Sequence, residues 1–121
     1  MDDLQVEASR YDLPSLIALQ DKRRENVALF ERSIQEEREI STQEERARVV
    51  LEEKIRLHEI GVARLDVATH ELVSSDLPKL VSTRARREET IGKLEAAIVE
   101  ERSQIAREGQ MITFLQAKEP A

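Results

Sequence analysis

Asp12-Leu13-Pro14 opens the stretch that decides the fold, and Asp76-Leu77-Pro78 repeats it later in the chain. Aspartate is a favourable helix N-cap, and proline fits the first helical turn, so each motif is expected to start a helix. Sliding residues 12–54 onto 76–118 without a gap gives 14 identities in 43 positions. These include the Asp-Leu-Pro start together with regularly spaced apolar positions, which favours an internal duplication of a helical segment.

From Leu13 onward, apolar residues follow the alternating 3-4 spacing that is typical of a coiled coil. The series reaches Leu72, skips one residue, and resumes at Leu77 to continue as far as Leu115. We therefore predict an all-α fold, an elongated antiparallel coiled coil, helical hairpin or bundle with long helices.

The expected segments follow from these two starts. They are a short acidic extension at 1–11, a long helix with the first repeat copy at 12–75, a second helix with the second copy at 76–118, and a tail at 119–121. Two places could break the first helix. One is 41–42, where a capping box occurs, and the other is Gly61, a residue type that commonly ends helices.

One stripe of residues is expected to form the interface between helices. Its predicted members are Leu13, Leu16, Arg23, Val27, Phe30, Ile34, Glu37, Leu51, Ile55, Val62, Leu65, Leu72, Leu80, Arg87, Ile91, Leu94, Ile98, Glu101, Ile105, Ile112 and Leu115.

The charges in this stripe indicate how two helices would pair. Arg23 and Glu37 flank an apolar centre in the first copy, and Arg87 and Glu101 flank the equivalent centre in the second. Parallel in-register packing would oppose like charges, which is costly. Antiparallel packing instead brings Arg23 to Glu101 and Glu37 to Arg87. The pattern therefore predicts antiparallel pairing.

Three antiparallel arrangements remain open from the sequence. A hairpin that bends at Gly61 gives the best charge match, whereas turn chemistry favours a bend at 76–78. An elongated dimer of two antiparallel chains satisfies the same charges.

Composition narrows the class of protein. Aromatic residues are only 2% and charged residues 36%, a balance typical of long helices rather than of an ordinary globule. The net charge of −6 and the mixture of both signs do not resemble a duplex-binding protein. There is no cysteine, so disulfides and thiol chemistry are excluded. We expect no signal peptide and no membrane span, and a cytoplasmic, intracellular location.

His58 and His70 are the only histidines. On one straight helix they would lie about 18 Å apart, too far to share a metal ion. We therefore expect no metal, no cofactor, no small-molecule substrate, no catalytic residue and no enzymatic activity.

The function expected from these features is that of a coiled-coil scaffold, spacer or adaptor in a larger assembly, with a cytoskeletal assembly as one setting. Its partners would be itself, as an antiparallel homo-oligomer such as a dimer, or other helical proteins. The alternative is a module that binds an anionic polymer, a microtubule or nucleic acid, through the basic clusters at 22–24 and 84–87, although nucleic acid is the less expected partner.

Overall fold

Aspartate side chains begin all three helices of the chain in a computed structural model that describes residues 2–61 and 66–118. The helices are α1 (Asp3–Ala8), α2 (Leu13–Glu59) and α3 (Val67–Lys118). Asp2, Asp12 and Asp66 each accept a hydrogen bond from the backbone N–H three residues on, at 2.9, 3.1 and 2.7 Å respectively. These caps satisfy N–H groups that have no partner within the helix.

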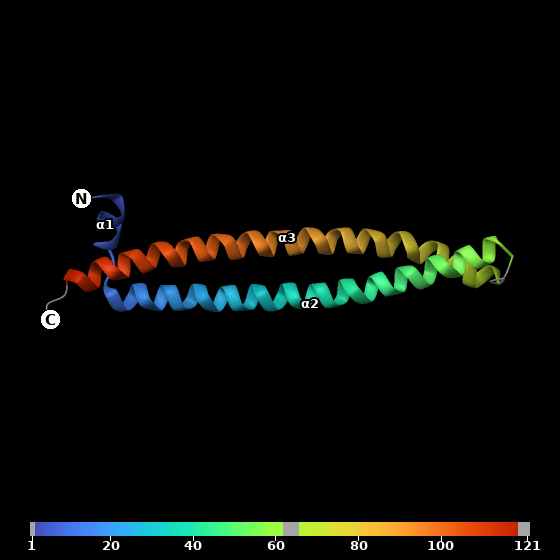
Figure 1. The fold of residues 1–121 in the computed structure, drawn as a ribbon, viewed down its shortest axis with the longest axis horizontal. Coiled ribbons are helices and arrows are strands. Elements are labelled where there is room, and N and C mark those ends of the chain that lie inside the picture. The colour runs from blue at the N-terminus through green and yellow to red at the C-terminus, as the bar shows by residue number, and fades with distance from the viewer. Residues whose placement is uncertain (1, 62–65, 119–121) are drawn as a thin grey trace. The chain divides into compact units, whose positions relative to one another are not determined.

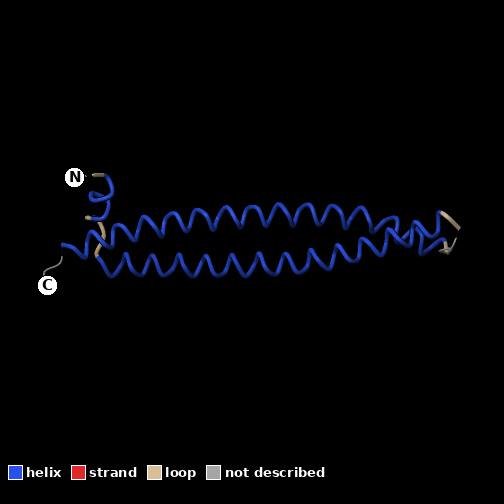
Figure 2. Tube along the Cα trace, in the orientation of Figure 1, coloured by secondary structure: helices blue, strands red, loops and turns tan. Residues whose placement is uncertain are grey.

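The fold class is the predicted one. Within the described residues the secondary structure is helix joined by short loops, with no strand (Figure 2). The chain divides into two compact units, one of Met1–Ser33 with Leu94–Ala121 and one of Ile34–Lys93. In each unit a part of α2 lies antiparallel against a part of α3 (Figure 1). The unit boundaries fall within these two long helices.

The position of the bend corrects the predicted segments. Helix α3 begins at Val67 and passes through Pro78, whereas a new helix was expected to start at Asp76. Proline cannot donate to the carbonyl four residues earlier, which costs about 3 kcal/mol in a helix interior. The same segment buries Val73, and burial of an aliphatic side chain contributes about 1.5–3 kcal/mol, which is comparable to the cost. An Asp-Leu-Pro motif favours a helix start but does not impose one.

Gly61 follows the end of α2. Its φ of +77° is in the left-handed region, which glycine adopts without steric cost. The Gly61 N–H donates to the His58 carbonyl at 3.1 Å, and the Ile60 N–H donates to the Arg56 carbonyl at 3.1 Å. Of the three arrangements left open, the second unit adopts the hairpin that bends near Gly61. Helix α2 is continuous through 41–42, the other candidate break.

This bend also changes which residues face the partner helix. Leu72 was expected in the interface but is 63% exposed, and its neighbour Val73 is buried at 6% exposure. Because α3 starts at Val67, this stretch follows the series of Leu77 and Leu80. Counting back from Leu77 by four and then three residues reaches Val73 and His70. The 3-4 series of interface positions in α2 therefore does not continue into α3.

The first unit has a small apolar core built from three segments. Ala8 and Leu16 are fully buried, and Met111 is 3% exposed. Around them pack Leu4, Leu19, Ile112, Phe114 and Leu115. Residues 1–11, expected to be only an extension, thus contain a helix that contributes to the core. Leu4, Val6 and Ala8 alternate along this stretch, but the stretch is too short for that pattern to predict a helix.

Candidate helix–helix interface

The predicted interface residues are mostly shielded from solvent. Four are buried, namely Leu16, Ile34, Ile91 and Ile98. Fourteen are partly buried, namely Leu13, Arg23, Val27, Phe30, Glu37, Leu51, Ile55, Leu80, Arg87, Leu94, Glu101, Ile105, Ile112 and Leu115. Leu72 is exposed, and Val62 and Leu65 lie outside the described residues. The interface is therefore a mixed stripe, apolar at its buried centres and charged between them.

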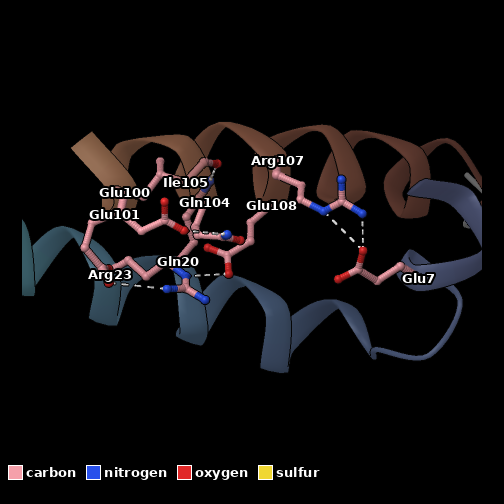
Figure 3. Close-up of polar contacts among 9 residues, drawn as sticks. All are labelled: Glu7, Gln20, Arg23, Glu100, Glu101, Gln104, Ile105, Arg107 and Glu108. Atoms are coloured by element: carbon pink, nitrogen blue, oxygen red, sulfur yellow. Dashed lines mark hydrogen bonds and ion pairs between the residues drawn. The ribbon is translucent and has the colours of Figure 1, made fainter. Parts of the chain in front are cut away.

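In the first unit, Arg23 on α2 reaches two glutamates on α3 (Figure 3). Its Nε donates to Glu108 Oε2 at 2.7 Å, and its Nη1 lies 3.4 Å from Glu101 Oε1. Hydrogen bonding to Glu108 raises the pKa of the Arg23 guanidinium, even though burial opposes the rise. Only 2% of Glu108 is exposed, so this carboxylate depends on Arg23 for compensation of its charge.

We call the group of Arg23, Glu101 and Glu108 a charged layer, and a neutral contact lies beside it. The Gln20 side chain is buried, and its Nε2 donates to the Ile105 carbonyl of α3 at 3.0 Å. That nitrogen lies 3.5 Å from the place where a Cβ of Gly109 would stand. Between Ile105 and Gly109 on α3, Arg107 binds Glu7 and so ties α1 to the same helix (Figure 3).

The second unit contains an equivalent charged layer centred on Arg87 of α3. Its Nη1 donates to Glu37, and its Nε donates to Glu44 Oε1 at 2.6 Å. Burial lowers the pKa of the Arg87 guanidinium, but hydrogen bonds to the two glutamates outweigh this, and the net shift is upward. Arg87 and Glu44 are the most shielded of the three, with side chains 15% and 12% exposed.

The two layers have the same composition in terms of the repeat. Aligning the copies matches Arg23 with Arg87, Glu37 with Glu101, and Glu44 with Glu108. Each arginine thus binds two carboxylates from the other copy, which are seven residues apart. The sequence predicted the pairs Arg23–Glu101 and Arg87–Glu37, and both are present.

Sequence reasoning missed one glutamate of each layer, Glu44 and Glu108. Both lie seven residues after the predicted partner, so the heptad spacing of the stripe could have predicted them.

The carboxylates of the two layers are not fully satisfied by hydrogen bonds. Among the described residues, Glu44 Oε2, Glu101 Oε2 and Glu108 Oε1 are buried without a hydrogen-bond partner. Burial of partly satisfied carboxylates is expensive, which argues that these layers define pairing more than they add stability.

A third group of charges in the second unit surrounds Glu45. Arg84 of α3 binds Glu45 across the interface, and Arg48 binds both Glu45 and Glu52 along α2. Hydrogen bonding to Arg48 is the main reason that the pKa of Glu45 is below its ordinary value, with Arg84 adding to the effect.

Most basic residues of the two clusters named in the alternative, polymer-binding interpretation are engaged in ion pairs. Arg23, Arg84 and Arg87 face glutamates of the opposite helix. Lys22 lies 3.6 Å from Glu25, and Arg24 lies 3.5 Å from Asp21, in exposed pairs within α2. These contacts weigh against polymer binding through 22–24 and 84–87, which stays a prediction.

The two histidines lie on different helices, which corrects the interpretation that placed them about 18 Å apart on one straight helix. His58 is in the last turn of α2, and His70 is near the start of α3. Their ring centroids are 4.7 Å apart, with the planes tilted by 40°. The bend near Gly61 brings them together.

These features define the class of the protein as all-α with long antiparallel helices joined by charged layers. Comparison with protein-family models finds no match, and comparisons with curated proteins and solved structures find none either. Within 2–61 and 66–118, no helix has the length and apolar character needed to cross a bilayer.

Proposed function

We propose that the chain is a non-enzymatic structural and interaction protein, a scaffold, spacer or adaptor that self-associates or docks partner helices in a larger assembly. The observation that carries this proposal is the pair of equivalent layers, in which Arg23 and Arg87 each bridge two glutamates of an antiparallel helix. Such layers select orientation and register, as polar residues do in coiled coils.

Because the segment is duplicated, these layers could pair with helices of other chains as well as within one chain. Because both copies carry the same order of charges, α2 of one chain can oppose α2 of another, with Arg23 facing Glu37 and Glu44. A partner helix with arginine and two glutamates at these spacings would present the same surface. The chain would then hold its partners at a separation set by helix length, which is the physical basis of a spacer or scaffold.

Complementary charge variants test this proposal. One variant carries Arg23→Glu and Arg87→Glu, and the other carries Glu37→Arg, Glu44→Arg, Glu101→Arg and Glu108→Arg. Each alone places like charges throughout the layers and should lose helicity in far-UV circular dichroism. Mixed one to one, the two should regain helicity and elute with the mass of a two-chain complex by light scattering.

The matched control places the same charge change outside the interface. Arg24→Glu with Arg86→Glu alters two exposed neighbours of the layer arginines and should leave helicity unchanged. If the spectrum of the mixture equals the mean of the two separate spectra, the layers act only within one chain, and docking of partners through them is excluded.

A further inference from the structure

The geometry points to a two-histidine site for a late first-row divalent metal ion at the end of the hairpin in the second unit. We propose that His58 and His70 together bind Zn²⁺, Cu²⁺ or Ni²⁺ and thereby join the last turn of α2 to the first turns of α3. The inference is independent of the proposed function, because it concerns residues outside the charged layers.

The separation of the rings is the first argument. In a complex with a metal–nitrogen bond of about 2.0–2.1 Å, each imidazole centroid lies about 3.2 Å from the metal. Two such ligands at angles of about 90–110° therefore have centroids about 4.5–5.2 Å apart. The observed separation of 4.7 Å falls within this range.

The origin of the two ligands is the second argument. His58 and His70 are the only histidines of the chain, they come from two different helices, and the fold places both at its bend. Both rings are only partly buried, so an ion and its waters can reach them. Imidazole nitrogen is a preferred ligand of copper, nickel and zinc and a poor ligand of magnesium and calcium.

The protein would supply only part of the coordination sphere of the metal ion. Across residues 2–61 and 66–118, no three histidine, aspartate or glutamate side chains gather closely enough to hold a metal. Water would complete the coordination sphere, as in other sites with few protein ligands. A site of this kind binds more weakly than a closed zinc site of four protein ligands, and its effect is to stabilise the folded hairpin by mass action.

Metal binding is tested on the full-length, untagged chain by isothermal titration calorimetry and thermal unfolding in a non-coordinating buffer. Addition of ZnCl₂, NiCl₂ or CuCl₂ should raise the unfolding midpoint and saturate at one ion per chain. MgCl₂ and CaCl₂ at equal concentration should not raise it, and EDTA should reverse the shift. Electron paramagnetic resonance of the Cu²⁺ complex should show coupling to two imidazole nitrogens.

The variants His58→Gln and His70→Gln separate this site from other binding. Circular dichroism without metal first establishes that each variant keeps its helicity, and each should then bind at least about tenfold more weakly because one of two preorganised ligands is gone. Retention of the Zn²⁺ and Cu²⁺ affinity by the double variant would show adventitious binding only and overturn the proposal, as would failure of the unaltered chain to bind either ion.

Discussion

Gly61 and Gly92 show how the same residue type has opposite consequences in this chain. Gly61 has a φ of +77° beyond the end of α2, where a side chain is strained. Gly92 lies within α3, with open space where a Cβ would stand. Backbone conformation, not available space, distinguishes the two positions.

Alanine at these positions should therefore shift stability in opposite directions. Gly61→Ala should lower the free energy of unfolding by about 1–2 kcal/mol, the cost of a left-handed alanine. Gly92→Ala should raise it by about 1 kcal/mol through helix propensity. Urea unfolding followed by circular dichroism measures both. A stabilising Gly61→Ala would show that the bend does not need a left-handed residue.

Glu45 is expected to contribute to the pH dependence of stability. Its pKa is below the ordinary value because Arg48 and then Arg84 favour the carboxylate. The unfolded chain therefore binds this proton more readily than the folded chain does. The contribution of Glu45 is present above its ordinary pKa of 4.5 and is lost as the pH falls through the lowered folded value.

The variant Glu45→Gln isolates this effect. Thermal unfolding at pH 7 should show the variant to be less stable than the unaltered chain, and the difference should shrink between about pH 5 and pH 2. Glu88→Gln serves as an exposed carboxylate control on α3. A difference that stays constant across this range would mean that Glu45 is not the titrating group.

At the scale of elements, the two Asp-Leu-Pro motifs have the same sequence and different roles. Asp12 caps α2, and Pro14 lies in the first turn, where its missing N–H costs little. Pro78 lies inside α3, because the helix already began at Val67. The preference of Asp-Leu-Pro for the start of a helix is thus followed in the first copy, whereas packing overrides it in the second.

Replacement of each proline by alanine should reveal this difference. Pro78→Ala should raise the free energy of unfolding by about 3 kcal/mol, since it restores an interior helical hydrogen bond. Pro14→Ala is the matched control and should change it by less than about 0.5 kcal/mol. Denaturant titrations of both variants provide the measurement. Equal effects would place Pro78 at a helix start after all.

At the scale of the whole molecule, the order of charges along the two copies specifies antiparallel pairing. Arg87→Glu with Glu101→Arg keeps the composition but puts a carboxylate opposite Glu37 and Glu44, and a guanidinium opposite Arg23. We expect a lower unfolding midpoint and weaker helicity, because buried like charges repel.

Two additional changes should restore this variant only in part. Arg23→Glu with Glu37→Arg re-forms the pairs that the sequence predicted, but Glu44 and Glu108 would still oppose carboxylates. Thermal unfolding of the double and quadruple variants makes the comparison. Full recovery of stability in the quadruple variant would mean that Glu44 and Glu108 contribute nothing to the layers. A double variant as stable as the unaltered chain would show that the layers do not specify the pairing of the helices.

The sequence by itself determined the helical class, the antiparallel sense and two of the four charge pairs that Arg23 and Arg87 make with glutamates of the opposite helix. These follow from helix propensity, apolar periodicity and charge order, all of which are properties of residues near one another in the chain. The missed contacts of Glu44 and Glu108 were within reach of the same periodicity.

Only the tertiary structure decided where the chain reverses, and three features depend on that choice. The bend near Gly61 makes Pro78 an interior residue, replaces Leu72 by Val73 in the interface, and brings His58 to His70. The docking of α1 on Leu16 and Met111 was likewise decided by the fold. Each depends on the free energy of packing between distant segments, which outweighs the local preference of a motif such as Asp76-Leu77-Pro78.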